Sequence, residues 1–202
     1  MKKTIFALSI LFSFLTVTVS QAQTPKQVLD KCAATLSSRD GVKADFSMSS
    51  AQYGNATGKI AIKGKMFHAT TPMATMWFDG KTLWTYMSNN EEVNVTNPSE
   101  AQLQVLNPYN FVNMYKNGFK YTMTQTDKAF NIHLTASDQS KRVKAMFITV
   151  DMKTYHPTEV KLLQKQKWTT FVISNISATK LADSEFRFNS KDFPSAEVID
   201  LR

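Results

Sequence analysis

The sequence predicts a mainly β fold of the α+β type: one large antiparallel sheet, preceded by a helix and covered by a short helical insertion. Two observations predict this fold. Segments of alternating apolar residues are separated by polar turns at a spacing of about ten residues, which is typical of a meandering antiparallel sheet. The run from Met76 to Tyr86 also places large apolar residues on both faces of one hairpin. Because neither face of such a hairpin can lie fully in water, we expect a sheet that is closed, half-closed or covered.

The first 22 residues have the three parts of a cleaved secretion signal. Lys2 and Lys3 provide the positive start, residues 5–19 are apolar, and Ser20 and Ala22 supply small residues before the cleavage site. The alternative is a membrane anchor. However, Ser and Thr interrupt the apolar run, which falls short of the roughly 20 residues that span a bilayer. We therefore expect export and cleavage after residue 22.

The remaining 180 residues (202 minus 22), 23–202, suit one soluble domain that buries a core without disulfides. The chain has a single cysteine, Cys32, so an internal disulfide is excluded. The sequence also argues against a lipid anchor, because Cys32 does not directly follow the apolar run of the signal. We expect it to be a small buried residue on a helix.

The chain is basic, with a formal net charge of +8, or +6 without Lys2 and Lys3. We expect no nucleic-acid partner, because the protein is exported and its basic residues are dispersed. They either lie solvated on a sheet face or contact an acidic partner or an anionic lipid surface, and the sequence leaves both readings open. The positions concerned are Lys59, Lys63, Lys65, Lys141, Arg142, Lys144, Lys161, Lys165 and Lys167.

The N-terminal helix is predicted over residues 25–37. Thr24 and Gln27 form a capping box around Pro25, and apolar residues follow at helical spacing. Residues 42–48 then alternate between apolar and polar, as a half-buried strand does.

The next strand follows a turn at Gly54-Asn55 and presents Ile60 and Ile62 on its apolar face. Gly64 is predicted to mark a β-bulge, because Phe67 beyond it has the wrong parity unless one residue is inserted.

Asp79-Gly80, between two apolar runs, predicts a hairpin with a two-residue type I′ turn. In that register Phe78 pairs with Lys81. Phe78, Met76 and Leu83 then share one face, and Trp77, Trp84 and Tyr86 share the other.

Two short helices are predicted over residues 98–106 and 108–117. An Asn-Pro pair begins each of them and Gly118 ends the second. They carry more apolar surface than they can bury against each other, so we expect them to cover the sheet. The β pattern resumes in segments named here by their apolar residues: Phe119/Tyr121/Met123, Phe130/Ile132/Leu134, Val143/Ala145/Phe147, Val160/Leu162, Trp168–Ile176 and a last strand with Phe186 and Phe188.

The search for catalytic and metal-binding motifs finds none. His68, His133 and His156 lack the spacing of metal ligands, and no second cysteine accompanies Cys32. We therefore expect a protein that is not an enzyme and that needs no cofactor or metal. The chain is instead rich in soft apolar residues, with 14 Phe and 10 Met, which suit either an ordinary core or a cavity for an apolar ligand.

Four motifs occur in a specific order after the signal and the first helix. They are Lys43-Ala44-Asp45-Phe46-Ser47-Met48, Gly58-Lys59-Ile60-Ala61-Ile62-Lys63, Asp79-Gly80-Lys81-Thr82-Leu83-Trp84-Thr85-Tyr86 and Asp183-Ser184-Glu185-Phe186-Arg187-Phe188, with a final Asp200-Leu201-Arg202. In this order the chain resembles the LolA family of outer-membrane lipoprotein carriers over essentially all of residues 23–202. The resemblance implies a half-closed antiparallel β-barrel whose helical lid covers an apolar cavity.

The resemblance also implies a function: a periplasmic carrier that shelters lipoprotein acyl chains. Its partners would be an inner-membrane lipoprotein-releasing transporter and an outer-membrane receptor or the membrane, and we expect a monomer. The lid would be residues 98–117 together with the first helix. The residues expected to line the cavity are Phe46, Met48, Ile60, Ile62, Phe67, Met76, Leu83, Leu103, Leu106 and Phe111.

Two other functions stay open. A periplasmic sensor on the same fold would bind a lipid or a partner and regulate an envelope response. A lipid-modifying enzyme would need a catalytic polar residue, and the sequence nominates none.

One departure from the family bears on gating. Where the family usually has an Arg that latches the lid, residues 63–67 offer Lys63 and Lys65 around Gly64, and a lysine cannot reproduce the fork of a guanidinium.

Overall fold

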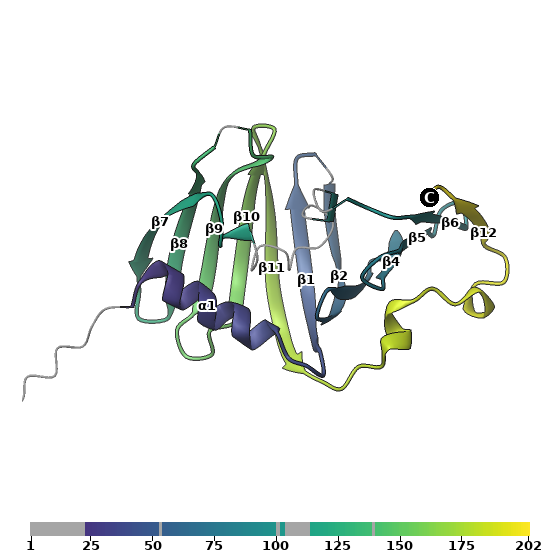
Figure 1. Ribbon diagram of the computed structural model, residues 1–202, viewed down its shortest axis with the longest axis horizontal. Helices are drawn as coiled ribbons and strands as arrows, with labels where there is room; N and C mark the ends of the chain where they lie inside the picture. The colour runs from purple at the N-terminus through teal and green to yellow at the C-terminus, as the bar shows by residue number, and fades with distance from the viewer. Residues whose placement is uncertain (1–22, 53, 100–101, 104–113, 139) are drawn as a thin grey trace, which may run out of the picture.

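The computed structural model describes residues 23–52, 54–99, 102–103, 114–138 and 140–202. These residues form one α-helix and a single sheet of twelve strands that does not close into a barrel (Figure 1). The strands are β1 (Val42–Ser50), β2 (Gly54–Lys63), β3 (Met66–Thr70), β4 (Ala74–Phe78), β5 (Leu83–Met87), β6 (Glu92–Thr96), β7 (Phe119–Gln125), β8 (Ala129–Ala136), β9 (Val143–Asp151), β10 (Pro157–Gln164), β11 (Lys167–Ala178) and β12 (Glu197–Asp200).

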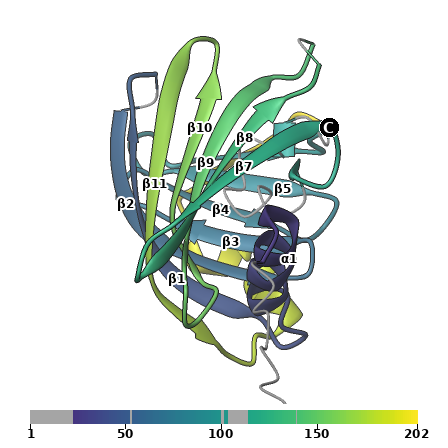
Figure 2. The ribbon, with the colours of Figure 1, turned by 90° about the vertical axis from the view of Figure 1, so that its left-hand side faces the viewer.

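Neighbouring strands follow the order β12-β6-β5-β4-β3-β2-β1-β11-β10-β9-β8-β7. Every pair is antiparallel except β12 with β6. Figure 2 shows the curvature of the sheet: β10 and β11 run nearly upright, while β3 to β5 run nearly level. The expectation of a mainly β fold on a half-closed antiparallel sheet is therefore confirmed.

Helix α1 (Pro25–Leu36) begins as the sequence predicts. The backbone N–H of Gln27 donates to Oγ1 of Thr24, and the Gln27 side chain accepts from the N–H of Thr24, which forms the capping box. The helix lies across β7 to β11 (Figure 1). We call the side of the sheet that it covers the inner face. The helix residues buried on this face are Val28, Leu29, Cys32 and Leu36.

The β4–β5 hairpin has the predicted faces but not the predicted turn. Phe78 pairs with Leu83, so the connection is the four residues 79–82 and not a two-residue turn. The Asp79 carboxylate accepts two backbone N–H groups of this loop, at 3.0 and 2.8 Å, and so stabilises the wider loop. Because each pairing moves by two residues, every side chain stays on its predicted face.

Gly64 is part of a turn and not of a bulge. Lys63 pairs with Met66, which leaves Gly64 and Lys65 as a two-residue hairpin turn. The φ of Gly64 is +60°, as the first central position of a type II′ turn requires. This turn places Phe67 opposite Ile62, so no inserted residue is needed to bury it.

The strands β7 to β11 form the predicted meander, but the alternation within β9 is not the predicted one. The register between β9 and β10 shifts between Val143 and Ala145. Beyond this irregularity Met146 and Ile148 are buried, whereas Phe147 is 41% exposed. The shift reverses the parity of the strand, which places Phe147 on the opposite face from Val143.

The C-terminal residues 179–202 run back over the face opposite α1, which we call the outer face. Phe186 is buried with Leu181 and Ala61, and the ring of Phe188 lies 5.6 Å from that of Trp77. The predicted strand at Phe186 and Phe188 is wrong. Residues Asp183–Phe186 form a 3₁₀ turn, and the last strand is β12, which pairs in parallel with β6. Phe186 is buried and Phe188 is partly buried, so an irregular segment can show the same apolar alternation as a strand.

Within the described part of the chain, no helix is both long and apolar enough to cross a membrane.

Candidate functional site

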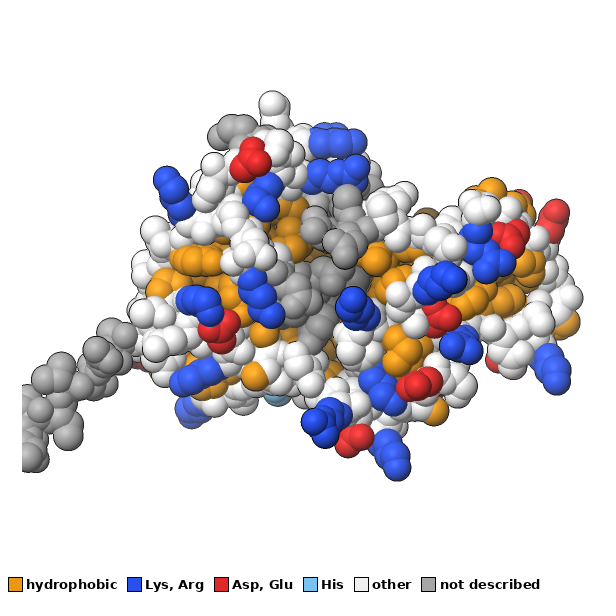
Figure 3. All heavy atoms as spheres, in the orientation of Figure 1, with side chains coloured by type: hydrophobic (Ala, Val, Ile, Leu, Met, Phe, Trp, Pro, Cys, Tyr) orange, Lys and Arg blue, Asp and Glu red, His pale blue; other side chains and the backbone are white. Residues whose placement is uncertain are grey.

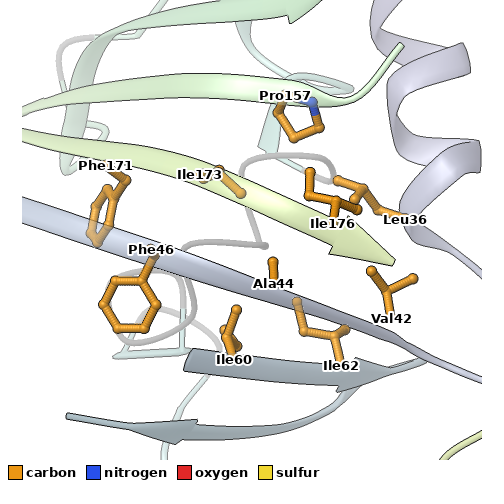
Figure 4. Close-up of a pocket in the computed structure, with 10 residues that line it drawn as sticks. All are labelled: Leu36, Val42, Ala44, Phe46, Ile60, Ile62, Pro157, Phe171, Ile173 and Ile176. Carbon is orange, nitrogen blue, oxygen red and sulfur yellow. The ribbon is translucent and has the colours of Figure 1, made fainter. Parts of the chain in front are cut away.

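The inner face of the sheet holds a small apolar cavity at the centre of the fold. Its volume is about 40 Å³, and all ten side chains that line it are apolar (Figure 4). They come from α1, β1, β2, β10 and β11, so the cavity lies where the two halves of the curved sheet meet under the helix. The lining residues are Leu36, Val42, Ala44, Phe46, Ile60, Ile62, Pro157, Phe171, Ile173 and Ile176.

Strand alternation positions one wall of the cavity. Val42, Ala44 and Phe46 occupy successive inner-face positions of β1, and Val42 and Ala44 pair with Ile62 and Ile60 of β2. Lys43 and Asp45 are therefore directed to the outer face. The wall is apolar because every second residue of these two strands is apolar.

Gly58 accommodates the Phe46 ring in this wall. The two residues pair across β1 and β2. A Cβ atom at Gly58 would lie 2.9 Å from Cζ of Phe46 and would also collide with the carbonyl oxygen of Thr70. These three residues can approach so closely only because Gly58 has no side chain.

A β-bulge in β11 positions the opposite wall. Asp45 pairs with Ser174 but Lys43 pairs with Ser177, so β11 contains one residue more than β1 here. Asn175 takes the left-handed conformation, with φ of +53°, and its Nδ2 donates to Oδ2 of Asp45 at 2.7 Å. The bulge brings both Ile173 and Ile176 to the cavity, although one is odd and the other even in number.

The cavity as it stands is much smaller than a ligand site, for which about 300 to 1,000 Å³ is typical. It is part of a larger apolar region, since its buried lining residues belong to the main hydrophobic cluster under α1. Several flexible methionines pack at the edge of this cluster without being fully buried: Met48, Met76, Met114, Met123 and Met152. Methionine adapts to irregular apolar neighbours, so this region can be repacked at low cost.

The structure brings most of the sequence-predicted lining residues to this inner face. Phe46, Ile60 and Ile62 line the cavity itself, whereas Phe67 and Leu83 are buried in the surrounding cluster. Met48, Met76 and Leu103 pack against the cluster and are partly buried. Leu106 and Phe111 lie outside the described residues. Binding of a ligand by these side chains stays a prediction.

Other lining residues were not named in the sequence analysis. Val42 and Ala44 share the parity of Phe46 and could have been named from alternation alone. Ile173 and Ile176 could not, because only the bulge at Asn175 brings both to one face. Pro157 also carries no sequence signal for a cavity.

Trp77, Trp84 and Tyr86 face away from this site, as predicted. Trp77 and Tyr86 pack against Phe193 of the C-terminal segment, with ring centroids 5.4 and 4.7 Å apart, and His68 stacks on Trp77 at 5.4 Å. These aromatic residues therefore hold the C-terminal segment on the outer face.

A hydrogen bond ties α1 to the residues that precede β7. The hydroxyl of Tyr115 donates to Oδ1 of Asp30 at 2.6 Å, and the hydroxyl of Tyr121 donates to the carbonyl oxygen of Tyr115. Lys26 also donates to Asp30, at 2.7 Å. The hydrogen bonds from Lys26 and then Tyr115 hold the pKa of the Asp30 carboxyl below its usual value, while burial and Asp30 raise the pKa of Tyr115.

Lys63, in the segment 63–67 where the resemblance led us to expect a latch, binds the C-terminal segment. Its Nζ donates to the carbonyl oxygen of Leu181 and to Oδ1 of Asp183, each at 2.8 Å. Lys63 thus acts on the outer face, on the opposite side of the sheet from α1.

Every described side chain that lines the cavity is apolar, and the nearby thiol of Cys32 is buried. Burial raises the pKa of the Cys32 thiol to about 12, which keeps it protonated and inert. In the residues that the structure covers, no group of His, Cys, Asp and Glu has an arrangement that could hold a metal ion. What the arrangement offers is apolar surface beneath a helix.

The fold and the site together define a class of β protein: a curved, unclosed sheet with an apolar inner face under a helix. The chain belongs to the family described as "Outer membrane lipoprotein carrier protein LolA", which it matches over residues 15–166. Among curated protein sequences, none matches the chain.

Solved structures are similar to the chain at low identity. An uncharacterized conserved protein from Thermus thermophilus has a TM-score of 0.59 and 10% identity, over 88% of this chain and 99% of that chain. A LolA superfamily protein from Nitrosomonas europaea has a TM-score of 0.46 and 11% identity, over 83% and 99%. The MucA/MucB complex from Pseudomonas aeruginosa has a TM-score of 0.44 and 13% identity, over 81% and 60%.

Proposed function

We propose that this protein is a periplasmic carrier that takes lipoprotein acyl chains into its inner face and hands the lipoprotein on without chemical change. The observation that carries the proposal is the inner face itself: a cavity lined by apolar side chains alone, inside a sheet that does not close. A polar ligand would find no hydrogen-bond partners there, whereas a hydrocarbon chain has no hydrogen bonds to lose. Membership of the LolA family supports the same reading.

The energetics of acyl chains explain why such a carrier needs this interior. Each CH₂ group exposed to water costs about 0.8 kcal/mol, so several long chains cost tens of kcal/mol to move through an aqueous compartment. A carrier must shelter them and then release them, which favours a pliable interior over a tight pocket. The adaptable methionines at the edge of the cluster suit that requirement.

The small volume of the cavity implies that loading widens it. The inner face is covered by α1, whose attachment combines apolar contacts with the hydrogen bond between Asp30 and Tyr115. In the proposed cycle, α1 moves away from the sheet as acyl chains enter and returns when they leave. An inner-membrane transporter would load the protein, and an outer-membrane receptor or the membrane would unload it, after export by the cleaved signal of residues 1–22.

The first experiment is native mass spectrometry, with lipid extraction, of the protein purified from periplasm. We expect a diacyl or triacyl lipoprotein to co-purify with it. Ala44→Phe, which fills the cavity, should reduce the bound fraction several-fold. Ser47→Phe adds the same ring to the exposed, outer face of the same strand and is the matched control.

A protein that purifies empty and takes up no lipoprotein from inner-membrane vesicles would overturn the carrier. The sensor on the same fold would then be the next hypothesis. Turnover of a lipid, lost on changing one polar residue, would instead favour an enzyme.

A further inference from the structure

The outer face of β9 and β11 carries apolar side chains that stay exposed within the described part of the fold. Phe147 is 41% exposed, Trp168 40% and Val172 47%. The Phe147 ring stacks on His133 with centroids 4.2 Å apart and lies 5.6 Å from the ring of Trp168. The C-terminal segment packs instead on Ala61 and Trp77 of β2 and β4. His133, Phe147 and Trp168 form an aromatic group that is separate from the cavity and from the packing of the C-terminal segment.

One end of this aromatic group is a protruding basic turn. Lys165 and Gln166 join β10 to β11, and both have positive φ, as a tight type I′ turn requires. Lys167 and the exposed Trp168 follow at once. Gln164 pairs with Val143, so Arg142 lies beside the same turn. We call Arg142, Lys165, Lys167 and Trp168 the basic tip. In Figure 1 the β10–β11 turn stands at the upper end of the sheet, and Figure 3 shows Lys and Arg side chains gathered at that end.

The charge of the basic tip is not balanced by its described neighbours. Within the described residues, no ion pair involves Arg142, Lys165 or Lys167, and all three are exposed. The nearest acidic residue along the β8–β9 loop is Asp138, whose carboxylate accepts hydrogen bonds from Ser140 and interacts with the charges of Lys141 and Lys144. The tip therefore presents positive charge and an aromatic ring together, on a convex end of the molecule.

We propose that the basic tip docks on the surface of an anionic lipid bilayer. Lysine and arginine near such a surface are attracted to the headgroups, and tryptophan prefers the boundary between headgroups and acyl chains. A convex turn suits a flat surface better than it suits an extended acidic peptide. Docked in this way, Lys165, Lys167 and Arg142 contact headgroups while Trp168 enters the interface. The proposal does not rest on the carrier function, because it concerns surface binding by protein without cargo.

The test is co-sedimentation with vesicles of phosphatidylcholine, with and without phosphatidylglycerol. We expect binding only to the anionic vesicles, weakened by added salt. The double variant Lys165→Gln/Lys167→Gln should bind about 25-fold more weakly, since each lysine contributes about fivefold. Trp168→Ser should also bind less and should lose the shift of tryptophan fluorescence to shorter wavelength that docking produces in the parent protein.

The matched control is Lys128→Gln/Lys153→Gln. Both lysines are exposed in turns at the other end of β8 to β11, and their loss changes the net charge by the same amount. They lie well beyond a Debye length of about 10 Å from the tip, so binding should change by less than about twofold. Melting temperatures confirm that each variant folds.

Three outcomes would overturn the proposal. The first is no binding to anionic vesicles. The second is equal weakening by the tip variant and the control, which would assign the effect to net charge. The third is binding that is insensitive to salt and to the tip variant but is lost in Ala44→Phe, which would assign it to lipid taken up by the cavity. Failure of docking leaves the carrier test unaffected, because that test measures co-purified lipoprotein.

Discussion

Tyr115 is fully buried, yet its hydroxyl reaches an exposed acid: it donates to Oδ1 of Asp30, whose side chain is 45% accessible, at 2.6 Å. This bond joins α1 to the residues that lead into β7. It is a polar interaction at the edge of an otherwise apolar contact. Removing it should therefore weaken the attachment of α1 without disturbing the core.

Tyr115→Phe should loosen α1 with little loss of global stability. The change removes one hydrogen bond to a carboxylate that water can still solvate, so we expect about 1 kcal/mol of destabilisation. Urea denaturation measures this loss, and hydrogen exchange of the α1 amides measures the loosening. Tyr121→Phe, which removes the neighbouring hydroxyl, is the control. Unchanged exchange in α1 would show that the bond does not hold the helix.

Low pH should weaken the hydrogen bond between Tyr115 and Asp30. Interactions with Lys26 and Tyr115 lower the pKa of Asp30 below the ordinary 3.8 in the folded protein. The folded state therefore releases this proton more readily than the unfolded state does. The interactions of the Asp30 carboxylate contribute fully to stability above the pKa of Asp30 in the unfolded chain, and this contribution is lost as the pH falls through its lower pKa in the folded protein. In Asp30→Asn the pH dependence of stability below about pH 4 should be shallower, as acid titration followed by circular dichroism would show. An identical acid transition in parent and variant would contradict the assignment.

The regular parts of the fold could be predicted from local sequence because local rules fix them. Thr24, Pro25 and Gln27 specify where α1 begins, and alternation in residues 42–48 specifies which side chains of β1 face inward. The faces of the β4–β5 hairpin were also predictable, since a shift of two residues leaves them unchanged.

The irregular parts depend on contacts that are distant in sequence. The bulge at Asn175 is supported by Asp45, 130 positions away, and the packing of Phe186 depends on Ala61. The Lys165-Gln166 turn has the backbone of a type I′ turn without its usual Asn-Gly signature. Each of these features determines which side chains line the cavity or lie on the outer face. For that reason the site was less predictable from the sequence than the fold.

Gly58→Ala should destabilise the protein strongly. The new Cβ would collide with the backbone carbonyl of Thr70, which cannot rotate away, and would press on the Phe46 ring. We expect a loss of about 2 to 3 kcal/mol, at the upper end of overpacking effects. Thr57→Ala, on the exposed neighbouring position, should change stability by less than about 0.5 kcal/mol. Thermal denaturation compares them, and equal melting temperatures would show that β2 and β3 can separate locally.

Lys63→Met should free the start of the C-terminal segment. It removes the bonds to Leu181 and Asp183, one of which is an ion pair with a 72% exposed carboxylate, so we expect a loss of about 1 kcal/mol. Faster exchange of the Leu181 N–H, which donates to the Asp40 carbonyl at 2.8 Å, reports the release. Lys59→Met removes a looser pair at 3.8 Å and should leave that amide unchanged. If lipoprotein uptake fell in Lys63→Met while the C-terminal segment stayed in place, Lys63 would have a gating role after all.

Asn175→Val should alter the cavity by way of the backbone. A β-branched residue is poorly tolerated at φ of +53°, at a cost of about 1 to 2 kcal/mol, and the variant also loses the bond to Asp45. Asn175→Gly keeps the conformation and loses only the side-chain bond, so it should be closer to the parent. Ser174→Val places the same side chain on the neighbouring exposed residue, where φ is not positive, and serves as the control. If the bulge positions Ile176, only Asn175→Val should reduce both stability and lipoprotein uptake. Equal uptake in all three variants would mean that the cavity tolerates the loss of the bulge.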